Sequence, residues 1–137
     1  MMNDCIFCTI VNGDIPSAKV YEDEHVYAFL DISQVTKGHT LVIPKIHKGN
    51  IFELTPDMAA PLFESVKKTA DAIQAAFSPK GMNLLNNNGE TAGQTVFHYH
   101  MHLIPRYGSD DGFHPVFKEH NQAYDLKEIA AAIRHQL

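Results

Sequence analysis

Three histidines alternate with apolar residues in the segment HYHMHLIP, residues 98–105. In a β-strand successive side chains point to opposite faces, so one face would carry His98, His100 and His102. The apolar residues between them would then face the core. Imidazoles that cluster near neutral pH repel one another once protonated, and such a cluster is more typical of a functional site than of a solvated strand face. The segment therefore predicts a site that binds or transforms a ligand.

Two kinds of chemistry suit three imidazoles on one face. They can hold one metal ion with an open coordination position, as in a zinc hydrolase, or one can act as a nucleophile while its neighbours position and protonate a substrate. Three ligands on one flat strand span roughly 13 Å, whereas a zinc–nitrogen bond is only about 2 Å long. The spacing favours nucleophilic catalysis, with metal-dependent hydrolysis as the alternative.

The chain has two cysteines, Cys5 and Cys8, in a C-x-x-C arrangement. In a reducing compartment this spacing indicates half of a metal site or a redox pair rather than a structural disulfide. The pair is weak evidence by itself, because a closed tetrahedral zinc site needs two further ligands.

The elements that must position these residues form an α+β pattern. We predict about five strands in a mainly antiparallel sheet, one long helix that begins at Thr55 and Pro56, and shorter helices near both ends. The two strands nearest the N-terminus form a hairpin, and the histidines lie on a long strand over 96–106. Asp125 should cap the last helix. The predicted segments are 5–11, 18–22, 26–30, 38–44, 55–77, 82–85, 96–106 and 125–137.

Length and composition predict one domain over residues 1–137, because 137 residues that are 45% hydrophobic can form one sizeable core. The motif-bearing part spans about 5–107, and 108–137 forms a tail with a helix. The net charge of −5 argues against a general affinity for nucleic acids or anionic membranes. The first residues lack the features of a signal peptide, and no apolar run is long enough to span a membrane, so we expect a cytoplasmic protein.

These segments resemble the histidine triad (HIT) superfamily, and most of all the small bacterial Hit proteins of its Hint-like, nucleotide-binding branch. Residues 98–104 match the signature His-φ-His-φ-His-φ-φ, where φ is apolar. The segments CIFCTIVNGDIPSAKVYEDE, FLDISQVTKGHTLVIPKIH and NNNGETAGQTVFHYHMHLIPRY are similar to family segments in the expected order. The resemblance implies a HIT-like fold and a homodimer in which two sheets join across a two-fold axis.

The resemblance also implies hydrolysis of purine nucleoside phosphoramidates or related nucleotides. His100 would attack the α-phosphorus, and water would then hydrolyse the nucleotidyl-histidine. His102 would contact the phosphate and assist proton transfer to the leaving group, while His98 would orient its neighbours. Gln94 and Thr95 would stabilise charge that develops on the phosphate oxygens. The alternatives are a non-catalytic nucleotide-binding module and the metal-dependent hydrolase.

The same resemblance assigns residues to nucleotide binding. An apolar slot would take the base and a carboxylate would accept from the ribose hydroxyls. The matching residues are Phe29, Asp31, Ile32, His39, Asn87, Gly93, Gln94 and Thr95. Taken alone, several of these have simpler interpretations, since Phe29 and Ile32 could be core residues and Asn87 a turn former.

For the cysteines, the resemblance supplies the two missing ligands. Relatives that carry the pair complete it with a histidine after the IPK strand and with the first histidine of the triad. Here Cys5, Cys8, His47 and His98 would make a closed Cys₂His₂ site for a structural Zn²⁺ that takes no part in the chemistry.

Overall fold

The computed structural model describes residues 4–137, and the first three residues lie outside this description. Its centre is a five-stranded sheet in the order β1-β2-β3-β5-β4, with every neighbouring pair antiparallel. The prediction of a mainly antiparallel α+β fold is thus confirmed, including the hairpin formed by the first two strands. The strands are β1 Lys19–Glu22, β2 Val26–Leu30, β3 Thr40–Pro44, β4 Gly81–Leu85 and β5 Met101–Arg106.

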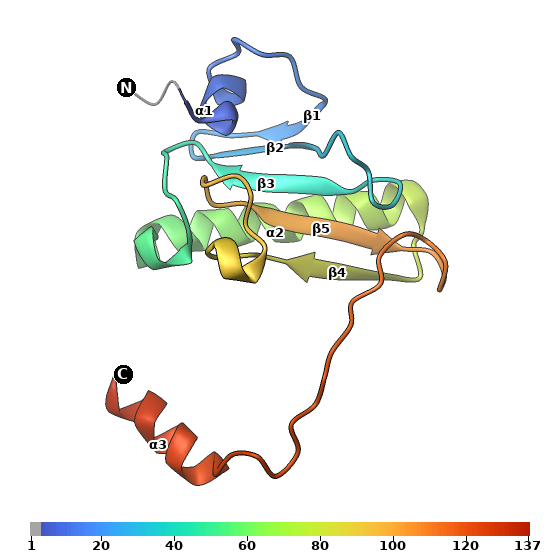
Figure 1. Ribbon diagram of the computed structural model, residues 1–137. Helices are drawn as coiled ribbons and strands as arrows, with labels where there is room; N and C mark the ends of the chain where they lie inside the picture. Colours follow the sequence, from blue (N-terminus) through green and yellow to red (C-terminus); the bar gives the residue numbers. More distant parts are fainter. Residues whose placement is uncertain (1–3) are drawn as a thin grey trace.

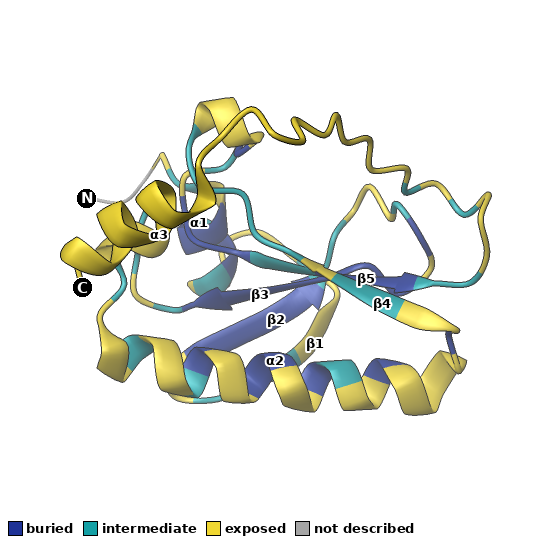
Figure 2. Cartoon of the chain, turned by 90° about the horizontal axis from the view of Figure 1, so that it is seen from below, coloured by how far each residue is buried: buried dark blue, intermediate teal, exposed yellow. Residues whose placement is uncertain are grey.

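The long helix α2, Pro56–Phe77, covers one face of the sheet. It begins where predicted, because Pro56 lacks a backbone N–H and its fixed φ suits the first helical position. Its apolar side chains recur at helical spacing and pack on β2, β3 and β5 (Figure 2). The core on this face contains Val26, Ala28, Val42, Leu62, Val66, Ile73, Tyr99 and Leu103.

The short helix α1, Ile6–Val11, covers the opposite face of the sheet (Figure 2). Cys5 is its N-cap, and the Cys5 sulfur accepts a hydrogen bond from the Cys8 N–H. Side chains from α1, β2 and β3 form a second core of Phe7, Ile10, Tyr27, Phe29, Leu41 and Ile43. The central strands β2 and β3 are therefore buried on both faces, whereas the residues of the edge strands β1 and β4 are exposed or half-buried.

The predicted strand over 96–106 is wrong in its first half, because β5 starts at Met101. The pairing of β3 with β5 covers only Thr40–Val42 opposite Met101–Leu103. If that register continued, Tyr99 would face Pro44, which has no N–H to donate. The Tyr99 N–H instead bonds the Lys48 carbonyl at 2.6 Å. His98 and His100 consequently lie in an irregular segment before the strand, and only His102 lies within it.

Beyond β5 the chain leaves the sheet as an extended arm and ends in α3, Leu126–His135 (Figure 1). Asp125 caps α3 by accepting from the N–H groups of Lys127 and Glu128, as predicted. Two short 3₁₀ turns, Ile51–Glu53 and Glu90–Ala92, lie in loops near the histidines. No helix within residues 4–137 is long and apolar enough to cross a membrane.

Candidate functional site

Two of the three histidines of the motif, His98 and His100, contact helix α1 just before the start of β5. His98 is 0% exposed and His100 is 6% exposed. The Phe7 ring of α1 meets both edge-on, with centroid distances of 6.0 Å to His98 and 5.1 Å to His100. His98 and His100 are thus sheltered under α1 and do not lie on the accessible strand face that alternation predicts, whereas His102 is partly exposed.

A backbone carbonyl fixes the proton of His100. The His100 Nδ1 lies 2.8 Å from the carbonyl oxygen of His98, and a nitrogen that faces a carbonyl must donate. The proton of the neutral ring therefore resides on Nδ1, and Nε2 carries the free lone pair. Burial lowers the pKa of His100, so the ring is neutral at pH 7. Asn86, which sequence reasoning missed, supports this arrangement because its amide donates to the His100 carbonyl at 2.9 Å.

His98 has the opposite tautomer. Its Nε2 lies 2.8 Å from the Pro44 carbonyl oxygen and must donate to it. Its Nδ1 therefore presents a lone pair, and this atom lies 3.4 Å from the Cys5 sulfur and 3.5 Å from the Cys8 sulfur. Two neighbouring histidines of one motif thus use different ring nitrogens, and they present their lone pairs to different surroundings.

The four predicted zinc ligands meet at one point. The Cys8 sulfur and the His98 Nδ1 each lie 3.3 Å from the His47 Nδ1, and all four ligand atoms lie within 4.8 Å of one another. A tetrahedral zinc ion with bonds of about 2.3 Å to sulfur and about 2.0 Å to nitrogen separates S···N pairs by about 3.5 Å and N···N pairs by about 3.3 Å. The residues present therefore fit a tetrahedral ion.

The Cys8 thiol is protonated near neutral pH. Burial, together with the neighbouring Cys5, raises the pKa of Cys8 to about 11. A metal that binds here must displace the proton, since the thiolate is the ligand. The ligands come from the start of α1, the loop after β3 and the segment before β5, so an ion at this point would join the N-terminus to the sheet.

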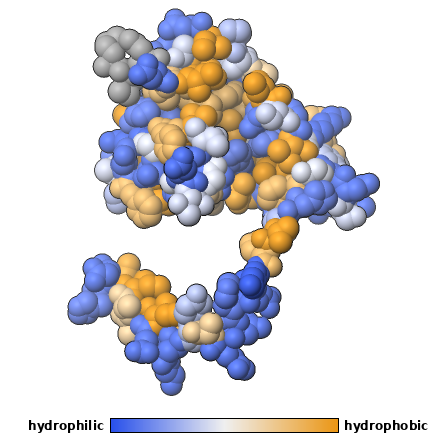
Figure 3. Space-filling model, in the orientation of Figure 1, coloured by the Kyte–Doolittle hydropathy of each residue, from blue (hydrophilic) through white to orange (hydrophobic). Residues whose placement is uncertain are grey.

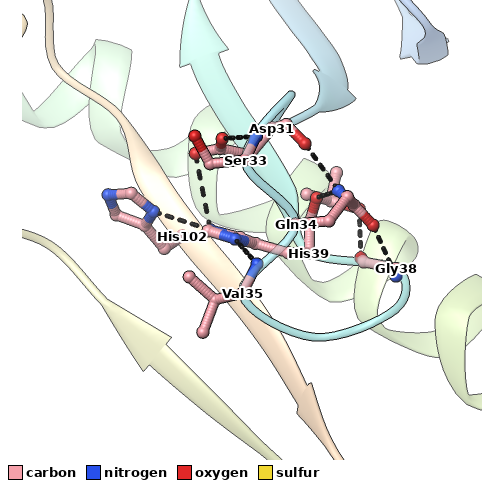
Figure 4. A network of polar contacts seen from close by, with 8 residues as sticks. Asp31, Ser33, Gln34, Val35, Gly38, His39 and His102 are labelled. Carbon is pink, nitrogen blue, oxygen red and sulfur yellow. Dashed lines mark hydrogen bonds and ion pairs between the residues drawn. The ribbon is translucent and has the colours of Figure 1, made fainter. Parts of the chain in front are cut away.

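His102 belongs to a second cluster that contains His39 and Asp31 (Figure 4). The Val35 N–H donates to the His39 Nδ1 at 3.3 Å, and the His39 Nε2 lies 2.9 Å from the His102 Nδ1. His39 therefore carries its proton on Nε2 and donates it to His102, whose own proton resides on Nε2. Burial, then the charges of His100 and His39, lower the pKa of His102 to about 4.

This second cluster also has the composition of a metal site, but its geometry is that of hydrogen bonds. The 2.9 Å between the two ring nitrogens is a hydrogen-bond length, shorter than the spacing of two nitrogens on a tetrahedral ion, about 3.3 Å. Each nitrogen of this pair already has its donor or acceptor. Asp31 lies nearby, with its carboxylate 3.7 Å from the His39 Nε2. The structure thus brings the predicted residues Asp31 and His39 together beside His102.

The loop before the triad is organised by Gln94. This side chain is 2% exposed. It accepts from the Gly89 N–H at 2.7 Å and donates to the carbonyls of Gly49 and Val96 at 2.7 and 3.0 Å. Its amide is therefore engaged with backbone groups of the protein, and the predicted role of Gln94 as a direct phosphate contact would require these bonds to change. Thr95 is exposed.

The remaining predicted nucleotide residues are not all brought together. Asn87 lies beside Gly93, where a Cβ would be 3.6 Å from the Asn87 amide nitrogen. Phe29 packs in the core against Phe7 at a centroid distance of 5.4 Å, as the simpler interpretation holds. Ile32 is 100% exposed, so it is not a core residue, and it forms no enclosed slot with Phe29.

Comparison with known proteins places these features in a family. The HIT domain matches residues 12–109. The chain is 62% identical over 137 residues to the protein hit of Bacillus subtilis, covering 98% of this chain and 94% of that protein. It is 42% identical over 136 residues to the adenosine 5′-monophosphoramidase hnt1 of Schizosaccharomyces pombe, covering 95% and 98%.

Solved structures agree. A HIT family protein from Bacillus anthracis has a TM-score of 0.94 and 62% identity over 98% of both chains. A zinc-bound histidine triad family protein from Mycobacterium smegmatis has a TM-score of 0.76 and 35% identity, covering 98% of this chain and 94% of that one. Both identities are high enough that the likeness reaches beyond a shared fold.

Proposed function

This chain belongs to the HIT domain family, and on that premise we propose that it hydrolyses purine nucleoside phosphoramidates or related nucleotides through a nucleotidyl-His100 intermediate. The observation that carries the proposal is the bond from the His100 Nδ1 to the His98 carbonyl. It leaves the Nε2 lone pair free on a neutral ring, which is the form in which imidazole is a nucleophile. A relative named as a phosphoramidase supports the choice of substrate.

The reaction balances over two steps. In the first, the His100 Nε2 forms a bond to the α-phosphorus while the bond from phosphorus to the leaving nitrogen breaks. The electron pair goes to that nitrogen, which takes up one proton. In the second, water attacks the phosphorus, the bond to His100 breaks with its electron pair returning to Nε2, and one proton is released. The His102 Nε2–H and the loop around Gln94 would stabilise the charge on the phosphoryl group.

The decisive experiment is to trap the intermediate. The full chain is mixed with adenosine 5′-phosphoramidate, quenched early and analysed by intact and peptide mass spectrometry. We expect an adenylyl group on His100, and we expect His100→Ala to form no adduct and to hydrolyse the substrate no faster than buffer. His114→Ala, an exposed histidine of the arm, is the matched control. Undiminished turnover by His100→Ala would show that the mechanism is wrong, and binding of AMP without turnover would indicate a non-catalytic module.

We also propose that Cys5, Cys8, His47 and His98 hold a structural Zn²⁺. The fit of their atoms to a tetrahedral ion supports this, and one structural neighbour is described as zinc-bound. Such an ion would supply a cross-link between α1 and the sheet. It would also fix the position of His98, the residue whose backbone carbonyl accepts from His100. The cytoplasm, where we propose that the protein acts, keeps both thiols reduced.

We further propose that the chain forms a homodimer. Strand β4 is an edge of the sheet, and the arm with α3 exposes apolar side chains that nothing in the described chain covers (Figure 3). They include Val116, Phe117, Leu126, Ile133 and Leu137. Exposed apolar area of this kind is typical of an interface. Sedimentation at micromolar concentration should give a dimer, and a monomer would contradict the proposal.

A further inference from the structure

The chain just after β5 folds back over the loop that carries Asp31 and His39. We call residues 105–113 the hook and residues 34–38 the anchored loop. The hook contacts three consecutive residues of the anchored loop, Val35, Thr36 and Lys37. The Thr36 hydroxyl donates to the Pro105 carbonyl at 2.6 Å, and the Tyr107 hydroxyl donates to the Lys37 carbonyl at 2.6 Å. Gly112 lies so close to the Val35 carbonyl that a Cβ at this position would be 2.5 Å from the oxygen.

Asp111 closes the hook. Its carboxylate accepts from the Nε and Nη2 of Arg106, both at 2.8 Å, and from the Tyr107 N–H at 2.9 Å. Arg106 also holds the pKa of Asp111 well below its usual range. A paired, bidentate carboxylate fixes the geometry of the residues around it. Gly112 follows with a φ of +101°, a conformation that favours glycine, and this turn brings it onto Val35.

The anchored loop in turn determines where His39 carries its proton. The Val35 N–H donates to the His39 Nδ1, which leaves the proton on Nε2 to be donated to the His102 Nδ1 (Figure 4). Gln34 stiffens the same loop, because its amide nitrogen donates to the carbonyls of Asp31 and His39, each at 2.7 Å, and its oxygen accepts from the Gly38 N–H at 2.9 Å.

We propose that the hook is a positioning device: Asp111 and Gly112 hold Val35 in place at its carbonyl, so that the Val35 N–H stays against His39, and His39 thereby keeps His102 with its proton on Nε2. The Nε2–H of His102 can then donate to the phosphoryl group or to the leaving group. The position of this proton is fixed by the contact between the His39 and His102 rings. The proposal rests on the proposed hydrolase function. Its two key residues, Asp111 and Gly112, lie past the matched HIT domain, which ends at residue 109.

The His39–His102 pair can also adopt the opposite tautomers, so a contact that selects one arrangement has a chemical effect. If the Val35 N–H moves away, His39 can carry its proton on Nδ1 and accept from His102 instead. The His102 proton then resides on Nδ1, and its Nε2 becomes an acceptor that repels phosphate oxygens. The two arrangements differ by one hydrogen bond, and the contacts of the hook select between them.

Nuclear magnetic resonance of the whole chain labelled with [¹⁵N]histidine tests the proposal without any substrate. We expect the His102 Nδ1 to be unprotonated and the Nε2 protonated in the parent at neutral pH, with the signals assigned by their loss in His102→Gln. In Asp111→Ala and in Gly112→Ala both nitrogens should shift towards averaged values. Matched controls are Asp110→Ala and Gly108→Ala, because Gly108 has space for a Cβ, 3.6 Å from the Asp110 carboxylate. Unchanged His102 signals in both Asp111→Ala and Gly112→Ala would overturn the proposal.

Kinetics on adenosine 5′-phosphoramidate test the consequence. Loss of one net hydrogen bond of about 1 kcal/mol corresponds to about a fivefold fall in kcat in Asp111→Ala. KM should stay within about twofold, since the hook touches no nucleotide-binding residue directly. An equal fall in the Asp110→Ala control would instead show a general effect of surface charge.

A double-mutant cycle separates positioning from general loosening. In His39→Gln the side-chain amide can donate to the His102 Nδ1 without help from Val35. Adding Asp111→Ala to His39→Gln should therefore change kcat by less than about twofold, whereas independent structural damage would multiply the two effects. If the parent shows neither turnover nor an adduct on His100, the proposed function fails, and the tautomer measurement still decides the role of the hook.

Discussion

Replacing His47 by alanine should destabilise the protein by an amount set by chain topology. The proposed zinc ligands Cys8 and His47 are 39 residues apart, and His47 and His98 are 51 apart. A cross-link that closes a loop of about 40 residues lowers the entropy of the unfolded chain enough to contribute about 4 kcal/mol. Removing His47 merges the two loops into one of 90 residues between Cys8 and His98, which removes about one such contribution. Complete removal of the ion opens the larger loop as well. For a chain of this size 1 kcal/mol corresponds to roughly 4 °C in Tm, so we expect His47→Ala to melt about 15 °C below the parent.

The assay combines thermal unfolding by circular dichroism with metal analysis of protein purified without added zinc. His25→Ala is the matched control, because His25 is an exposed histidine outside the ligand cluster. A chelator should bring the parent at least down to the melting temperature of His47→Ala, which separates loss of the ion from loss of the side chain's packing. The reasoning is refuted if the parent holds less than about a tenth of an equivalent of zinc, or if His47→Ala melts within about 3 °C of it.

Three further predictions concern other parts of the site. Burial lowers the pKa of His100 from 6.5, and protonation removes its lone pair, so the acid limb of a pH–rate profile should lie below pH 6.5 and not at it. Because burial also lowers the pKa of His102 from 6.5 to about 4, an unfolded chain takes up more protons between these values; urea unfolding should show stability falling as pH drops from 6.5 towards 4 and no such trend above it. Phe29→Ala should cost about 3 to 5 kcal/mol in urea unfolding because Phe29 is a core residue, whereas Ile32→Ser, at a fully exposed position, should leave stability unchanged and raise KM if Ile32 contacts the base.

Most helices and strands of the fold could be predicted from local sequence patterns. Pro56, after Thr55, marks the start of α2, because a proline lacks a backbone N–H and suits the first position of any helix. Asp125 marks the start of α3, because its carboxylate accepts from the first N–H groups of the helix. The strand boundary at Met101 was not predictable in this way. It depends on Pro44, which is 57 residues away in sequence and becomes relevant only when β3 and β5 are paired.

The metal cluster could be predicted in part. The C-x-x-C spacing indicates two candidate ligands from the sequence alone. The choice of His47 and His98 comes from a resemblance, because nothing local sets His47 apart and the alternating pattern does not say which of its three histidines would bind a metal. The structure adds an independent reason for His98, because the Pro44 carbonyl takes its Nε2 proton and so exposes the Nδ1 lone pair to the thiols. Asn86 and Gln34 carry no comparable signal. They are polar loop residues whose importance depends on which backbone groups they reach.

Alternation of histidine with apolar residues suggests three equivalent rings, yet the three rings have three different partners. The Pro44 carbonyl leaves His98 with its lone pair on Nδ1, the His98 carbonyl leaves His100 with its lone pair on Nε2, and the His39 ring leaves His102 with its proton on Nε2. Had β5 extended to residue 96, the carbonyl of His98 would have been available to a neighbouring strand and its ring would have shared a face with the other two. The early end of the strand is thus what frees backbone carbonyls to assign protons, and the division of labour among identical side chains is a consequence of irregular backbone.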